Sequence, residues 1–103
     1  MTEPLPIEFS AMARAQVHEA ETWWNTNRPK SPGAVQSEFE RFSSLIARHP
    51  QVGTRSTNSV LRNVRRVHLG RIHYDLYYRV AEDPARLQIL ALWHARRGSR
   101  PTI

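Results

Sequence analysis

The sequence contains no cysteine among its 103 residues. That absence excludes disulfide bridges and thiolate ligands for a metal, and it fits a reducing compartment. Lysine is nearly missing as well, because Lys30 is the only one and the other basic residues are all arginine. The planar guanidinium of arginine favours phosphate and carboxylate partners. The composition therefore points away from disulfide-rich and zinc-thiolate proteins.

Long apolar runs are also missing. No stretch approaches the roughly 18 to 20 residues that a transmembrane helix needs, and the first nine residues have neither region of a signal peptide. We therefore expect a cytoplasmic protein that does not bind a membrane. A chain of this length supports one hydrophobic core, so we expect a single domain over residues 1–103.

Several catalytic motifs are absent from the sequence. It has no glycine-rich phosphate loop, no zinc-ligand motif and no nucleophile elbow. We therefore predict no cofactor and no metal site.

The positive charge is unevenly distributed. Residues 1–61 carry six basic and six acidic side chains, whereas residues 62–103 carry nine arginines against three acidic residues, Asp75, Glu82 and Asp83. The whole excess of the net charge of +6 thus lies in the last part of the chain. Such an asymmetry favours an anionic partner over a merely solvated surface.

The last third of the chain predicts three strands in an antiparallel meander. Apolar and polar residues alternate from Ile72 to Val80, with the period of two that a half-buried strand requires. A turn at Gly70-Arg71 precedes this strand, and residues 81–86 form the second turn. These turns place His68 opposite His73, Arg66 opposite Asp75, and Tyr74 opposite Trp93.

This pairing divides the side chains of the sheet between two faces. The apolar face is predicted to carry Val67, Leu69, Ile72, Tyr74, Leu76, Tyr78, Val80, Leu87, Ile89, Ala91 and Trp93. The other face is predicted to carry Arg62, Arg66, His68, His73, Asp75, Arg79, Gln88 and His94, with Tyr77, Leu90 and Leu92 among them. An apolar face of this width needs a cover.

Two helices are the predicted cover. Ser10 is suited to cap a helix with an apolar stripe of Ala13, Val17, Ala20 and Trp24, and Ser31-Pro32 is suited to start another, with a stripe of Val35, Phe39, Phe42, Leu45 and Ile46. Their short connection predicts an antiparallel hairpin. Residues 7–9 are expected to add a short edge strand. The predicted fold class is α+β, with a two-helix hairpin packed on one face of a three-stranded meander.

His68, His73 and His94 form a row in the predicted sheet, and the row allows three interpretations. A zinc site lacks a carboxylate support apart from Asp75. An acid–base site for RNA cleavage would use histidines for proton transfer and arginines such as Arg66 for the phosphorane charge. In the third interpretation the histidines are structural or contact a partner.

Four other residues are candidates for binding. Arg62 opposite Arg79 would place two like charges together, which costs energy unless an anion lies between them. Tyr77 lies on the polar face of the predicted sheet. Trp23 is flanking on its helix, next to the core residue Trp24, and we expect it to be partly exposed at a partner surface.

The ordered set of elements, with Ile72-His73-Tyr74-Asp75-Leu76-Tyr77-Tyr78-Arg79-Val80 followed by Trp93-His94-Ala95-Arg96-Arg97, resembles the RelE/ParE toxin superfamily on its ParE side. The resemblance implies a small cytoplasmic toxin of a type II toxin–antitoxin module, neutralised by a ParD-like antitoxin encoded beside it. It further implies inhibition of DNA gyrase by binding, with operator DNA reached only indirectly through the antitoxin.

The alternative within the same superfamily is a RelE-like, metal-independent endoribonuclease that cleaves messenger RNA on the ribosome. RelE-type sites rely on several lysines and arginines, whereas this sequence has a single lysine and no tyrosine after Trp93. The ParE-like interpretation is therefore favoured, with Arg62, Arg79, Tyr77, Trp23, Arg96 and Arg97 as candidate contacts for antitoxin or target. Under the alternative, the catalytic candidates are His68, His73, His94 and Arg66.

Overall fold

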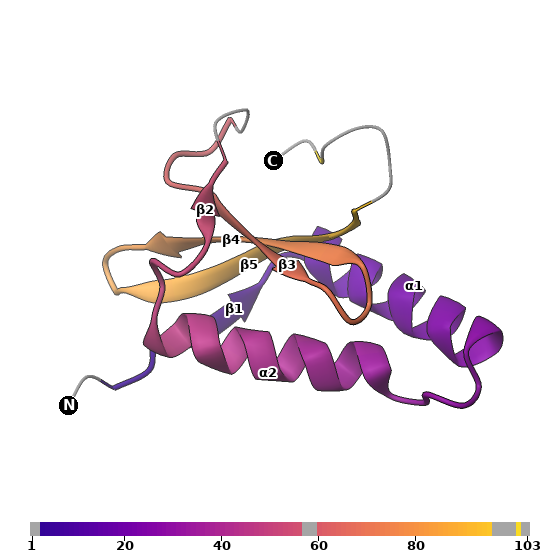
Figure 1. Cartoon of the computed structure of the whole chain (residues 1–103). Helices are drawn as coiled ribbons and strands as arrows, with labels where there is room; N and C mark the ends of the chain where they lie inside the picture. The colour runs from indigo at the N-terminus through magenta and orange to yellow at the C-terminus, as the bar shows by residue number, and fades with distance from the viewer. Residues whose placement is uncertain (1–2, 57–59, 96–100, 102–103) are drawn as a thin grey trace.

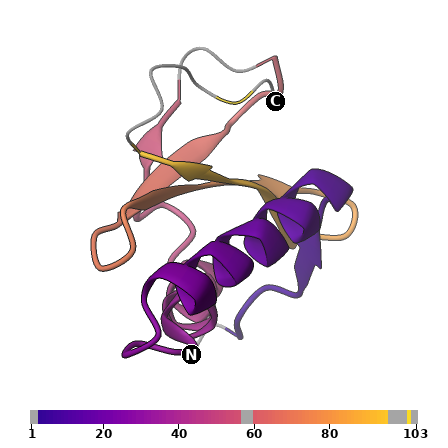
Figure 2. The ribbon, with the colours of Figure 1, turned by 90° about the vertical axis from the view of Figure 1, so that its right-hand side faces the viewer.

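The computed structural model describes residues 3–56, 60–95 and 101. Along these residues the elements follow in the order β1 (Ile7–Phe9), α1 (Ala11–Asn27), α2 (Ala34–Arg48), β2 (Thr54–Arg55), β3 (Arg65–Leu69), β4 (Tyr74–Ala81) and β5 (Arg86–His94). They form a sheet in the order β1-β5-β4-β3-β2, with β1 parallel to β5 and the other pairs antiparallel. Both helices lie on one face of it (Figures 1 and 2).

The predicted α+β fold is confirmed, and the sheet is wider than expected. The meander of β3, β4 and β5 gains β1 at one edge, as expected for residues 7–9, and β2 at the other. Neither helix is long and apolar enough to cross a membrane, within the residues that the structure describes.

Helix α1 begins as its sequence predicts. The Ser10 side chain accepts a hydrogen bond from the Ala13 amide at 3.0 Å, and it also donates to the Leu90 carbonyl at 2.9 Å. The first bond satisfies a free amide of the helix N-terminus, and the second ties the helix to β5. Ala13 and Ala20 are buried, and Val17 and Trp24 pack against the same core.

Helix α2 starts later than predicted. Its N-cap is Gly33, which has φ +75°, so Ser31 and Pro32 belong to the turn that precedes the helix and are not its cap and first residue. The positive φ explains the glycine, since other residues rarely adopt that region. The helix ends at Arg48, as predicted from His49-Pro50.

The pairing of β3 with β4 differs from the prediction by two residues. The amides of Ile72 and His73 both bond to the Leu69 carbonyl, so residues 70–73 form a wider turn and Leu69 pairs with Tyr74. Because side chains alternate with a period of two, a shift of two leaves the faces of these strands as predicted.

A β-bulge changes the faces of β5. Tyr78 pairs with Ile89 as predicted, whereas Tyr77 pairs with Ala91, so Leu90 is an extra residue in β5. Beyond a bulge, the following residues exchange faces. The prediction was therefore wrong for Leu92, which lies in the core under the helices, and for Ala91 and Trp93, which belong to a small cluster with Val64, Tyr77 and Leu90.

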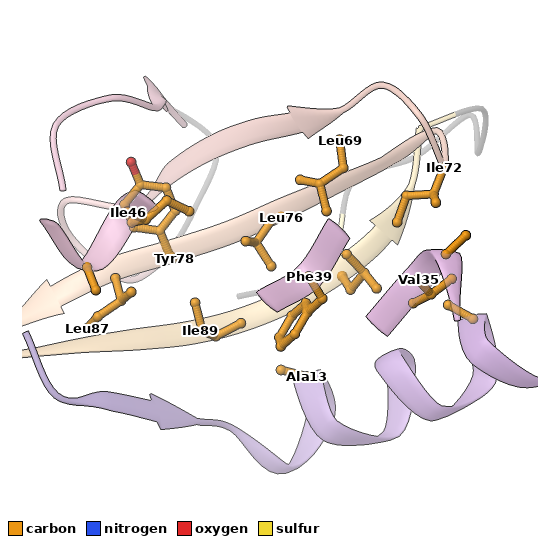
Figure 3. Packing of buried hydrophobic residues seen from close by; sticks show 14 residues of the cluster. Ala13, Val35, Phe39, Ile46, Leu69, Ile72, Leu76, Tyr78, Leu87 and Ile89 are labelled. Carbon is orange, nitrogen blue, oxygen red and sulfur yellow. The ribbon is translucent and has the colours of Figure 1, made fainter. Parts of the chain in front are cut away.

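The main core lies between the sheet and the helix hairpin. Leu69, Leu76 and Tyr78 from the sheet meet Val35, Phe39 and Ile46 from α2, and Figure 3 shows these side chains pointing into the shared layer. The predicted core roles of Tyr74 and Tyr78 are confirmed, since Tyr78 is fully buried and Tyr74 packs at the edge of the cluster.

Candidate partner-binding surface

The β2–β3 edge of the sheet carries a group of arginines. Arg55 on β2 pairs with Arg65 on β3, and Thr54 pairs with Arg66. Residues directly opposite each other share a face, so Arg65 lies on the face of its β4 partner Tyr78, towards the helices. Arg66 lies on the face away from the helices. We call Arg55, Arg62, Arg65 and Arg66 the arginine edge.

Tyr78 and Gly53 fix the loop that leads to this edge. The Tyr78 hydroxyl accepts from the Gly53 amide at 2.8 Å and donates to the Pro50 carbonyl at 2.9 Å. Arg65 Nη1 donates to the Gly53 carbonyl at 2.7 Å. Burial raises the pKa of Tyr78, against the lowering effects of the Gly53 hydrogen bond and the Arg65 charge. The hydroxyl therefore stays protonated and serves as both donor and acceptor.

The predicted histidine row does not form. His68 Nδ1 lies 2.9 Å from Asp75 Oδ1, because His68 pairs with Asp75 and not with His73. His73 lies in the turn, with φ +60°, and His94 packs edge-on against Tyr74 with ring centroids 5.1 Å apart. No group of three metal-ligating side chains occurs among the residues that the structure describes.

Two predicted charge pairs are also wrong. Arg66 pairs with Tyr77 instead of Asp75, again because the first turn is wider. Arg62 lies before β3 in an exposed turn, so it does not face Arg79. Arg79 is partly buried, and its Nε donates to Gln88 Oε1 at 2.7 Å.

The contact residues predicted from the sequence differ in exposure. Tyr77 lies on the expected face, but it is only 2% exposed and packs with Val64, Leu90 and Ala91. Trp23 is 48% exposed, as expected for a flanking residue, while its neighbour Trp24 packs on the core. Arg96 and Arg97 lie outside the described residues.

Trp23 also borders a hollow between α1 and the end of β5. Its volume is about 180 Å³, and its lining includes Glu19, Trp93 and His94. Gln16 forms part of the wall, and its Oε1 accepts from the Leu92 amide at 2.8 Å. An exposed tryptophan beside a hollow is a common feature of interface hot spots.

Sequence reasoning missed both the hollow and the cross-strand pair Arg55–Arg65. The hollow depends on the bulge at Leu90, which sets the direction of Trp93 and His94. The arginine pair depends on β2, whose two residues are too few to show a period. The turn residues Gly53 and Asn63 around them were the only available signal.

The chain matches a family model described as the ParE toxin of the type II toxin–antitoxin system parDE, over residues 7–98. It belongs to the ParE toxin family. The resemblance noted in the sequence is thereby confirmed, and this ParE-family chain is a toxin-type component of a type II toxin–antitoxin system. A search of curated proteins gives no significant match.

Two solved structures share the fold of this ParE-family chain. One is described as the chromosomal ParDE toxin–antitoxin system from P. aeruginosa, with 20% identity and a TM-score of 0.71, covering 92% of this chain and 100% of that one. The other is the toxin–antitoxin complex RelBE2 from Mycobacterium tuberculosis, with 22% identity and a TM-score of 0.64, covering 89% and 99%.

Proposed function

We propose that this ParE-family toxin inhibits DNA gyrase by binding it, and that a ParD-like antitoxin neutralises the toxin. The observation that carries this proposal is the family match over residues 7–98. The dispersal of the three histidines supports it, because it removes the constellation that favoured RNA cleavage. Binding to these two partners would require a cytoplasmic toxin, and operator DNA would be reached through the antitoxin.

Two surfaces are the proposed contacts. Trp23 and its hollow are suited to an amphipathic segment of the antitoxin, because an exposed aromatic ring gains much from burial. Arg62 and Arg66 are suited to acidic side chains, since no salt bridge holds either within the described residues. Arg96 and Arg97 remain in the proposal on their charge alone. Arg79 and Tyr77 are secondary, because one is bound to Gln88 and the other is buried.

One observation keeps a second function open, namely RelE-like cleavage of messenger RNA. His68 is exposed and bonded to Asp75, and Arg66 lies two residues away on the same face of β3. A carboxylate that orients an imidazole favours a general base, and a nearby guanidinium stabilises a phosphorane. This group provides a base for the 2′-hydroxyl, but His73 and His94 do not join it to supply an acid.

Supercoiling by purified gyrase and messenger RNA cleavage on translating ribosomes separate the two functions. We expect the purified chain to inhibit supercoiling, and we expect His68→Ala to leave that inhibition within about twofold, because the two proposed contact surfaces do not include this imidazole. His18→Ala is the matched control, since His18 is an exposed histidine on α1.

Ribosome-dependent cleavage that falls by about 100-fold or more in His68→Ala would establish the RelE-like function instead. Unimpaired supercoiling at toxin concentrations that arrest growth would refute the gyrase proposal. Rescue of growth by the neighbouring open reading frame would identify the antitoxin.

A further inference from the structure

A pocket is lined by residues from the segment after α2, from β2, β3 and β4, and from the β4–β5 turn. Figure 1 shows that the end of α2, β2 and the β4–β5 turn lie at the same end of the sheet. The volume of the pocket is about 310 Å³. The polar residues that line it are Gln51, Arg55, Asn63, Arg65, Tyr78 and Glu82, and Pro50 and Val80 complete the lining. It is separate from the Trp23 hollow, with which it shares no lining residue.

The two arginines of this pocket are directly opposite each other on β2 and β3. Like charges in that position destabilise a strand pair. Neither Arg55 nor Arg65 forms a salt bridge with an acidic residue in the described part of the chain. A bound anion would relieve this repulsion, because each guanidinium prefers an oxyanion to solvent alone.

Arg65 is already held in place for such a ligand. Its Nη1 donates to the Gly53 carbonyl at 2.7 Å and to the Gln51 carbonyl at 3.4 Å, which leaves donors on its other nitrogens. Gly53 is in turn fixed by the buried Tyr78 hydroxyl. Little side-chain entropy therefore remains to be lost at Arg65 when an anion binds.

Asn63 and Glu82 set limits on the ligand. Asn63 has φ +61°, a conformation that asparagine tolerates better than most residues, and it lines the same pocket. Glu82 also lines the pocket, and the negative charge of its side chain opposes an anion. Binding therefore requires that both guanidiniums outweigh one carboxylate.

We propose that this pocket binds a single phosphate group, supplied as inorganic phosphate or as a phosphate monoester. A carboxylate has two oxygens, which one guanidinium fork already satisfies, whereas a tetrahedral phosphate has enough oxygens for two forks on different strands. The site goes beyond gyrase and antitoxin binding. It shares Arg55 and Arg65 with the arginine edge, but the residues proposed for partner contact, Trp23, Arg62 and Arg66, do not line it.

Thermal unfolding and isothermal titration of the full chain with sodium phosphate at pH 7.5 test the proposal, with sodium chloride and sodium acetate at equal ionic strength as comparisons. We expect phosphate alone to raise Tm, because a ligand that binds only the folded state stabilises it. Arg55→Ala should weaken phosphate binding about tenfold or more, since a charge-assisted contact is lost. Glu82→Gln should tighten binding severalfold.

Arg28→Ala is the matched control, because Arg28 is exposed at the end of α1 and does not line the pocket, and this variant should bind phosphate as the wild type does. The proposal is overturned if Arg55→Ala retains full phosphate affinity or if chloride gives the same rise in Tm. Acetate binding as tight as phosphate would assign the pocket to a carboxylate, such as that of an acidic peptide, and would also overturn it. None of these outcomes bears on gyrase inhibition.

Discussion

Gly53 is the residue on which the arginine edge depends most closely. A Cβ atom at this position would lie 2.6 Å from the Tyr78 hydroxyl and 2.8 Å from the Arg66 carbonyl. One of these atoms belongs to the backbone of β3 and the other is fixed by two hydrogen bonds. Neither can move aside easily, so the close packing of this loop on the sheet requires glycine.

We therefore expect Gly53→Ala to lower the free energy of unfolding by about 1 to 3 kcal/mol, the usual cost of overpacking. Gly70→Ala is the control, because its Cβ would meet only His68 Cδ2 at 3.8 Å, an ordinary contact. Urea denaturation measures both variants. Equal stability of the two variants would mean that the loop can move to accommodate the Cβ atom without cost, and that the hydrogen bond between Gly53 and Tyr78 does not hold the loop rigidly.

At the scale of elements, periodicity made the helices predictable. The stripes Ala13–Ala20 and Val35–Ile46 were found because spacings of three and four residues identify a buried helix face. The C-terminal ends of both helices were predicted from the polar residues that follow α1 and from the proline that follows α2. The start of α2 was misplaced, because Gly33 forms the N-cap through its backbone conformation and not through a side chain.

The registers of the sheet were not predictable in the same way. The sequence around Gly70 is compatible with a two-residue turn and with a four-residue turn. The structure has the longer turn, in which two backbone amides bond to the Leu69 carbonyl. The bulge at Leu90 has no sequence signal of its own, since leucine is a normal strand residue. These two features separated the histidines and exchanged the faces of Leu92 and Trp93, so the candidate site was predicted less well than the fold.

Helix α1 and its N-cap supply hydrogen-bond partners to the edge of β5 that β1 leaves unpaired. Strand β1 pairs only with residues 87–89, and beyond it the Ser10 hydroxyl bonds to the Leu90 carbonyl and Gln16 bonds to the Leu92 amide. Side chains of α1 thus continue the hydrogen bonding where the edge strand stops. This arrangement fixes α1 along β5 and shapes the hollow beside Trp23.

Gln16→Ala should lower the free energy of unfolding by about 1 to 3 kcal/mol, because it leaves the Leu92 amide without its partner. Gln36→Ala is the control, since Gln36 bonds to Glu40 on the exposed side of α2 and the loss of this bond should cost no more than about 0.5 kcal/mol. Thermal unfolding of the two variants measures both losses of stability. A loss for Gln36→Ala as large as that for Gln16→Ala would contradict the structural role of Gln16.

At the scale of the whole molecule, charge and apolar contact lie on different parts of the surface. Arg62, Arg65 and Arg66 join Arg55 at the β2–β3 edge, whereas Trp23 lies on α1 beside the end of β5. Long-range attraction acts on the rate of encounter, while a buried aromatic contact acts mainly on the rate of dissociation. An acidic antitoxin that spans both surfaces should therefore show the two effects separately.

We expect the association rate constant of toxin and antitoxin, measured by stopped-flow fluorescence, to fall about tenfold or more between about 50 mM and 500 mM sodium chloride. The double variant Arg62→Ala, Arg66→Ala should reduce both the association rate constant and its salt dependence. Arg28→Ala, Arg48→Ala is its charge-matched control at the C-terminal ends of the two helices. Trp23→Ala should instead raise the dissociation rate constant about tenfold or more and leave association nearly unchanged. Equal effects of the two arginine pairs would show that net charge, and not the position of Arg62 and Arg66, attracts the partner. An unchanged dissociation rate constant for Trp23→Ala would contradict antitoxin binding at Trp23.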